Sequence, residues 1–153
     1  MKISRTLINA FRTTLLTSCL FLTSCIFVPA IDSIKKAGIT ENDRKQLLAV
    51  EVKKFHDAIN WSNPHEAMSY VDAQSLDTLG PRLRESAENE KIFETKVKNI
   101  VFEDDAYAAS VEVSTRLYKV PVYVVHDRLE NEKWRFSLSD GWKILEKTEI
   151  AAK

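Results

Sequence analysis

The sequence predicts an α+β domain in which N-terminal helices pack on a curved antiparallel meander sheet. Apolar residues first recur with helical spacing between residues 48 and 59. After residue 93 the pattern changes to an alternation of apolar and polar residues, which is typical of half-buried strands. The dipeptide Asp140-Gly141 separates two such runs and is a strong hairpin signal. Helices followed by consecutive antiparallel strands give a two-layer α+β architecture.

The first helix is predicted to begin after Thr40 and to end near Trp61. Thr40 is a favourable N-cap, and Glu41 and Asp43 lie in the first turn, where the helix dipole favours acidic side chains. One apolar stripe follows, made of Leu48, Val52, Phe55 and Ile59.

Shorter helices are predicted after the first one. Ser62 or Asn63 can cap a helix that has Pro64 at its first position. A third helical segment begins near Asp72, and we expect Gly80-Pro81 to break it before residues 82–90 resume in a charged helical register.

Five strand segments are predicted in the second half. They cover residues 93–101, 107–117, 120–129, 133–139 and 142–147, with a turn at residues 103–105. Residues 130–132 form either a turn or a bulge within one long bent strand. At the hairpin we expect a two-residue loop, with Ser139 facing Trp142 and with Trp142 and Trp134 buried in the sheet.

The segment from Trp134 to Ile144, WRFSLSDGWKI, resembles the last hairpin of the nuclear-transport-factor-type cone fold, also called cystatin-like. The long first helix and the short helices around Pro64 and Pro81 add to this resemblance, which covers residues 40–147. It implies a cone enclosed by the concave face of the sheet and the helices. It implies little about function, because this fold carries isomerases, dehydratases, ligand binders and assembly proteins.

The N-terminus has the features of a secretory signal. Three basic residues within positions 1–12 precede an uncharged run. The run contains Leu22-Thr23-Ser24-Cys25, which resembles the lipobox of bacterial lipoproteins. The resemblance implies a signal peptide over residues 1–24 and a lipid, such as palmitate, on Cys25. We therefore predict a tether over residues 25–39 and a domain over residues 40–150.

Two alternatives to this assignment remain open. Leu16-Thr17-Ser18-Cys19 also fits a lipobox, but only six residues separate Arg12 from Cys19, whereas signal peptides usually carry about 7–15 apolar residues. Alternatively, the uncharged residues 13–31 stay uncleaved as a membrane anchor, since a spanning helix needs about 20 residues. Either version exports the domain. Ile26, and not an Asp, follows Cys25, and in a Gram-negative cell the resemblance to sorted lipoproteins then implies the periplasmic face of the outer membrane.

Composition excludes several functions for the domain. The only two cysteines are Cys19 and Cys25, so the domain has no disulfide, cysteine metal site or cysteine nucleophile. Residues 1–25 hold three of the 22 basic residues and none of the 22 acidic ones, which leaves a net charge of −3. A nucleic-acid binder usually shows a basic excess, so nucleic acid is not a predicted partner.

The candidate pocket residues are His56, Tyr70, Asp72, His126 and Trp134. The resemblance implies that an enzyme of this fold would use an Asp or His base with a Tyr, Asp or Arg partner inside the cone. Each residue also has a structural interpretation: a boundary histidine for His56, a helix cap or turn for Tyr70 and Asp72, a buried or edge histidine for His126, and sheet core for Trp134. We assign no catalytic residue, metal or cofactor, because no histidine has a partner fixed by local spacing.

The predicted function is a membrane-anchored envelope lipoprotein. Its cone domain is expected to be non-enzymatic and to bind a protein partner or a small apolar ligand. One alternative is an inner-membrane assembly component that resembles the cone-domain subunit of type IV secretion systems. Another is an isomerase or lyase that uses His56 or His126 with Tyr70 or Asp72.

Overall fold

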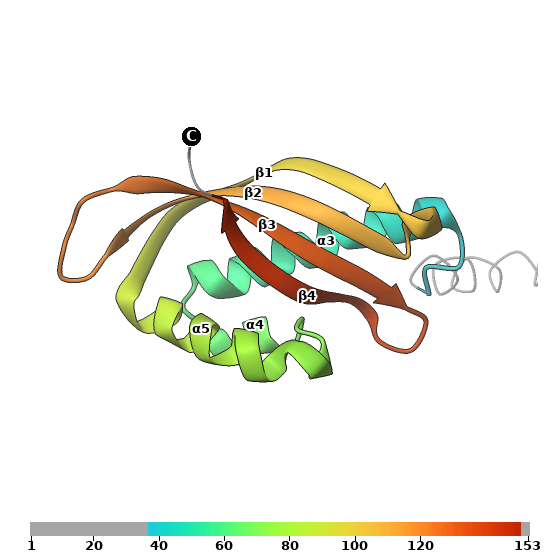
Figure 1. Cartoon of the computed structure of the whole chain (residues 1–153), viewed down its shortest axis with the longest axis horizontal. Coiled ribbons are helices and arrows are strands. Elements are labelled where there is room, and N and C mark those ends of the chain that lie inside the picture. Colours follow the sequence, from blue (N-terminus) through green and yellow to red (C-terminus); the bar gives the residue numbers. More distant parts are fainter. Residues whose placement is uncertain (1–36, 151–153) are drawn as a thin grey trace, which may run out of the picture. The chain divides into compact units, whose positions relative to one another are not determined.

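The computed structural model describes residues 37–150, and residues from Gly38 onward form one compact unit (Figure 1). The predicted signal peptide, Cys25 and the tether up to residue 36 lie outside the described residues. The elements follow in the order α3 (Glu41–Asn60), α4 (Pro64–Met68), η1 (Ala73–Ser75), α5 (Leu76–Asn89), β1 (Glu90–Glu103), η2 (Asp104–Ala106), β2 (Ala108–Lys119), β3 (His126–Ser137) and β4 (Gly141–Ile150). Helices thus precede a four-stranded antiparallel sheet, and the predicted fold class is confirmed.

The first two helices begin where the sequence predicts. Thr40 caps α3, because its hydroxyl accepts a hydrogen bond from the backbone N–H of Asp43 at 3.2 Å. Asn63 caps α4 in the same way through the backbone N–H of Glu66. None of the helices in residues 37–150 has the length and apolarity that crossing a membrane requires.

The predicted break at Gly80-Pro81 is wrong, because α5 continues through both residues to Asn89. Proline inside a helix removes one backbone hydrogen bond. Packing outweighs this cost, since Leu79 and Leu83 are buried on either side of it. Gly80 also allows close approach to α4, where a Cβ would lie 3.4 Å from the sulfur of Met68.

The sheet has the strand order β1-β2-β3-β4, with each neighbouring pair antiparallel. The predicted strand over residues 120–129 is wrong in its first half: residues 120–125 connect β2 to β3 outside the sheet. Pro121 lacks the N–H that a strand between two others would donate. Residues 130–132 are neither a turn nor a bulge on β3. They continue it without a break, paired with both β2 and β4.

The last hairpin differs from the predicted two-residue loop. Ser137 pairs with Gly141, so residues 138–140 form a three-residue connection. Gly141 has φ of +71°, a conformation that glycine adopts without strain. Phe136, and not Ser139, therefore faces Trp142, while Trp134 pairs with Ile144.

One hydrophobic core lies between α3, α5 and the concave face of the sheet (Figure 1). Trp134 and Trp142 are both buried in it, as predicted. Other members from the helices and the sheet include Leu48, Val52, Phe55, Phe136 and Ile144.

Candidate functional site

One face of β3 carries acidic side chains into the cone next to the aromatic core. Glu130, Glu132, Trp134 and Phe136 alternate along the strand and are all buried. Lys147 of β4 pairs in register with Glu132, and cross-strand partners share a face of the sheet. Between Ile144 and Glu146 the register shifts by one residue, which turns Lys147 to the same side as the buried Trp142 and Ile144.

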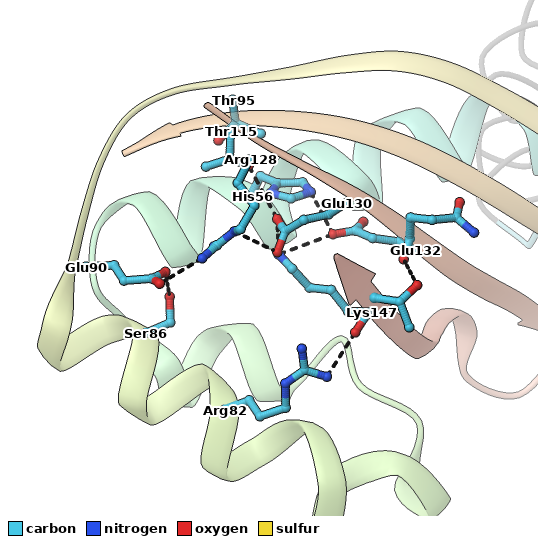
Figure 2. A network of polar contacts seen from close by, with 12 residues as sticks. His56, Arg82, Ser86, Glu90, Thr95, Thr115, Arg128, Glu130, Glu132 and Lys147 are labelled. Atoms are coloured by element: carbon cyan, nitrogen blue, oxygen red, sulfur yellow. Dashed lines mark hydrogen bonds and ion pairs between the residues drawn. The ribbon is translucent and has the colours of Figure 1, made fainter. Parts of the chain in front are cut away.

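Glu132 is fully buried and lies close to three nitrogen atoms. Figure 2 shows its carboxylate beside His56 and Lys147. Its Oε1 atom is 3.1 Å from Nε2 of His56 and 3.5 Å from Nζ of Lys147. Its Oε2 atom accepts a hydrogen bond from Nε1 of Trp134 at 3.2 Å. His56 and Glu132 are within ion-pair distance but are not aligned as a hydrogen bond.

The contacts continue outward in alternating charge (Figure 2). Lys147 Nζ lies 3.1 Å from Oε2 of Glu130, whose Oε1 lies 3.1 Å from Nε of Arg128. Arg128 reaches Glu90 at 2.7 Å, and Ser86 also donates to that carboxylate. We call this set the buried ion-pair cluster; it consists of His56, Glu132, Lys147, Glu130, Arg128 and Glu90.

The cluster keeps Glu132 ionised. Burial by itself would raise the pKa of its carboxyl group, since a low-dielectric interior disfavours charge. The attraction of His56 and Lys147 and the hydrogen bond from Trp134 outweigh burial and lower the pKa to about 2. The Oε2 atom of Glu132 is thus hydrogen-bonded, whereas its Oε1 atom lies within ion-pair distance of His56 and Lys147 without a hydrogen bond.

Glu132 should make the stability of the domain fall in acid. Its pKa of about 2 in the folded state lies below the ordinary value of 4.5, so the unfolded state binds more protons in acid. The stabilisation is fully present above pH 4.5 and is lost as the pH falls towards 2. We expect urea unfolding from pH 6 to pH 2 to show this loss, and Glu132→Gln to flatten it. If the stability of the Glu132→Gln variant falls as steeply between pH 6 and pH 2, Glu132 is not the group responsible for the loss.

A cavity of about 380 Å³ opens beside the cluster, between α5 and strands β3 and β4. Charged side chains of both signs line it, and Glu130, Arg128, Lys147 and Glu90 of the cluster are among them. His56 and Glu132 do not line the cavity, and both are buried behind it. A general base must reach the proton that it abstracts. His56 does not face the cavity and is therefore not placed to act as a general base on a molecule bound there.

The structure brings together two of the five candidate pocket residues. His56 and Trp134 both contact Glu132. The expectation that His56 is a boundary histidine is wrong, because Glu132 allows the ring to be buried inside the cone. His126 is exposed at the start of β3, six residues from Glu132 and thus about 20 Å along the strand.

Tyr70 and Asp72 occupy structural positions near the end of α4. Tyr70 is half-buried and packs edge-on against Phe55 at a centroid distance of 6.3 Å. Asp72 accepts a hydrogen bond from the backbone of Gln74, at the start of η1, and forms a 2.8 Å ion pair with Arg135. The carboxylate of Asp72 is thus already bound from both sides.

Sequence reasoning missed the five members of the cluster that lie on the strands, namely Glu90, Arg128, Glu130, Glu132 and Lys147. Residues 130–132 had the composition of a turn. The available signal was the period of two, which places both glutamates on the same face as Trp134 and Phe136. Among residues 37–150, no three His, Asp or Glu side chains are grouped as a metal site requires.

A second feature lies at the connection between β2 and β3. Residues 120–125, Val-Pro-Val-Tyr-Val-Val, contain no charge, and all six are exposed. The ring of Tyr123 packs at a tilt against Tyr118 of β2, and Tyr118 packs in the same way against Phe93 of β1, with centroid distances of 5.2 and 5.3 Å. We call this surface the apolar tip; it consists of Phe93, Tyr118 and residues 120–125. Figure 1 shows the connection extending beyond the helical layer.

Comparison with solved structures supports a cone-type fold. A ketosteroid isomerase-like protein from Erwinia carotovora atroseptica matches with a TM-score of 0.55 and 15% identity, over 70% of this chain and 96% of that one. A SEC-C motif containing protein from Rhodopseudomonas palustris matches with a TM-score of 0.53 and 14% identity, over 63% and 73% of the two chains. At this identity the likeness shows the fold alone. No family model and no curated protein matches the sequence.

Proposed function

We propose that this protein is an envelope lipoprotein, anchored through a lipid on Cys25, whose cone domain binds protein through the apolar tip. The anchor rests on the sequence Leu22-Thr23-Ser24-Cys25 behind a basic N-terminus. Binding rests on one observation, the contiguous exposed surface of valine and aromatic side chains at one end of the sheet. Contiguous apolar surface of this kind is typical of interaction sites.

The interior of the cone favours this function over binding of an apolar ligand or catalysis. The cavity beside the buried ion-pair cluster is lined by four basic and four acidic residues. Apolar ligands bind in pockets lined mainly by hydrophobic side chains. His56 does not line this cavity, and its Nε2 atom lies 3.1 Å from the fully buried carboxylate of Glu132. The apolar tip, by contrast, lies outside the cone and exposes valine and aromatic side chains next to one another.

The lipid anchor predicts a specific processing defect. Cys25→Ala should abolish incorporation of a radiolabelled fatty acid and leave a larger precursor, because no acyl acceptor remains at the cleavage site. Cys19→Ala serves as the matched control and should change neither labelling nor size. Normal processing of Cys25→Ala combined with failure of Cys19→Ala would assign the lipid to Cys19. Normal processing of both variants would refute lipidation.

Protein binding at the tip is tested by thiol labelling of the full chain. Tyr123 and Leu138 are both 71% exposed in the single chain, at the β2–β3 connection and the last hairpin respectively. We expect Tyr123→Cys to react more slowly with a maleimide-polyethylene glycol than Leu138→Cys in cell envelopes, and equally fast after dilution in detergent. Equal rates in envelopes would contradict the proposal. The unsubstituted chain measures the background from Cys19 and Cys25.

A further inference from the structure

We propose that the cavity beside the buried ion-pair cluster binds an alkylammonium group, that is, a primary amine on an aliphatic stem, as in a lysine side chain. The cavity lies between α5 and strands β3 and β4 and has a volume of about 380 Å³. Small-ligand sites usually measure about 300–1,000 Å³. This site goes beyond the proposed function, which concerns the apolar tip.

The cavity has an apolar side and a charged side. Ile59 of α3 and Leu79 and Leu83 of α5 line it, and all three side chains are buried. Every strand residue that lines the cavity is charged. A lysine side chain has the same two parts, since its stem packs on apolar surface while its ammonium group stays among polar groups. The lining therefore fits a ligand with an aliphatic stem and a charged head.

The charges around the cavity favour a positive head group. Four basic and four acidic residues line the cavity, and the buried Glu132 adds a fifth carboxylate behind them. With His56 neutral, this set carries one negative charge in excess. One bound ammonium group compensates that excess, whereas a bound carboxylate would increase it.

The carboxylates that remain for a ligand are those of Glu149 and Glu85. The basic residues on the strands already form ion pairs with other carboxylates of the cluster. Within residues 37–150, neither Glu149 nor Glu85 forms an ion pair, although both line the cavity. Glu149 also lies directly opposite Glu130 in the register of β3 and β4. Like charges directly opposite each other are destabilising, so a cation beside Glu149 relieves a repulsion.

Arg82 is the basic lining residue whose charge has no carboxylate partner among residues 37–150. Its guanidinium group donates a 3.0 Å hydrogen bond to the backbone carbonyl of Lys147 (Figure 2). The charge of Arg82 repels an ammonium group but attracts an anion. Removing this charge therefore distinguishes a cationic ligand from an anionic or zwitterionic one.

Titration of the full chain in detergent with N-acetyl-lysine methylamide tests the site. The amide NMR signals of Ser86 and Asn89, which line the cavity, should shift and saturate. N-acetyl-norleucine methylamide has the same aliphatic stem without the ammonium group, and we expect it to bind about tenfold more weakly. The absence of saturable shifts, or equal binding of the two probes, would overturn the inference.

Three charge-removing variants at exposed positions test the polarity of the site. Glu149→Gln should weaken binding of the lysine probe about fivefold, which is the upper range for an exposed ion pair. Arg82→Gln should strengthen it, because a repelling charge is removed. Glu146→Gln on the opposite side of β4 is the matched control and should leave the affinity unchanged. An affinity that Glu149→Gln does not lower, or that Arg82→Gln does not raise, would overturn the inference.

The ammonium group has two possible sources, a lysine of the protein on the apolar tip or a free amine. Val120 belongs to the tip and also lines the cavity, so a protein on the tip can place a lysine there. Only this source rests on the proposed function. Rapid maleimide labelling of Tyr123→Cys combined with intact binding of the lysine probe would refute the tip and leave the cavity site standing.

Carbodiimide treatment of cell envelopes distinguishes the two sources, because it couples a carboxylate to an amine beside it. A product enlarged by a second protein, and lost in Glu149→Gln, identifies a protein lysine. A small mass increase on the peptide that contains Glu149 identifies a free amine. If neither product depends on Glu149, no ammonium group occupies the cavity in the cell and the inference is overturned.

Discussion

Replacing Glu132 with Gln is expected to lower the free energy of unfolding by roughly 3–5 kcal/mol. The side chain is completely buried, and its carboxylate lies against His56 and Lys147. Glutamine keeps the volume but removes the negative charge, which leaves the ammonium group of Lys147 with Glu130 alone inside the cone. Urea unfolding monitored by tryptophan fluorescence at pH 7 measures the loss.

The matched control is Glu146→Gln on the opposite side of β4. Glu146 forms a 2.7 Å ion pair with Lys133, but both side chains are about half exposed. Solvated pairs of this kind contribute about 0–1 kcal/mol. Combining Glu132→Gln with Lys147→Met should recover part of the loss, because the partly unpaired cation is removed. If Glu132→Gln and Glu146→Gln lower the free energy of unfolding by similar amounts, the buried ion pairs stabilise the domain no more than the exposed pair does.

Replacing Trp142 with Ala is expected to cost roughly 3–5 kcal/mol of stability, because it leaves a large cavity in the core. Trp142 is only 2% exposed, and its ring packs against Phe136 at a centroid distance of 5.5 Å. Its indole N–H also donates a 2.8 Å hydrogen bond to the backbone carbonyl of Arg44, which ties β4 to α3. The denaturant midpoint measures the effect.

Trp61→Ala is the matched control for this substitution. Trp61 follows α3 and is 84% exposed, so its removal should change stability by about 0.5 kcal/mol or less. If Trp142→Ala shifts the denaturant midpoint no more than Trp61→Ala does, Trp142 does not lie in the core.

Much of the fold follows from local sequence patterns. The cap at Thr40, the apolar stripe of α3 and the alternation in β2 each depend on residues that are close in sequence. The same patterns failed where distant contacts decide the outcome. α5 passes Pro81 because Leu79 and Leu83 are buried in the core.

Contacts between residues that are distant in sequence also form the buried ion-pair cluster, so local patterns could not predict it. Glu130 and Glu132 have the composition of a turn, but inside the cone their carboxylates lie against Arg128 of the same strand and Lys147 of β4. His56 lies about 75 positions from Glu132 in the sequence, so no local spacing links the two. The sequence did place His56 and Trp134 among the candidate residues, but not the carboxylate that joins them.

Hydrogen exchange of the backbone amides of residues 122–125 tests most directly whether the apolar tip is a docking surface. These amides have no backbone partner in the described chain, so they should exchange rapidly in the diluted, detergent-solubilised protein. In cell envelopes at native abundance we predict slow exchange of these four amides, while the amides of β3 stay protected in both samples. Rapid exchange in both samples would contradict docking through the tip.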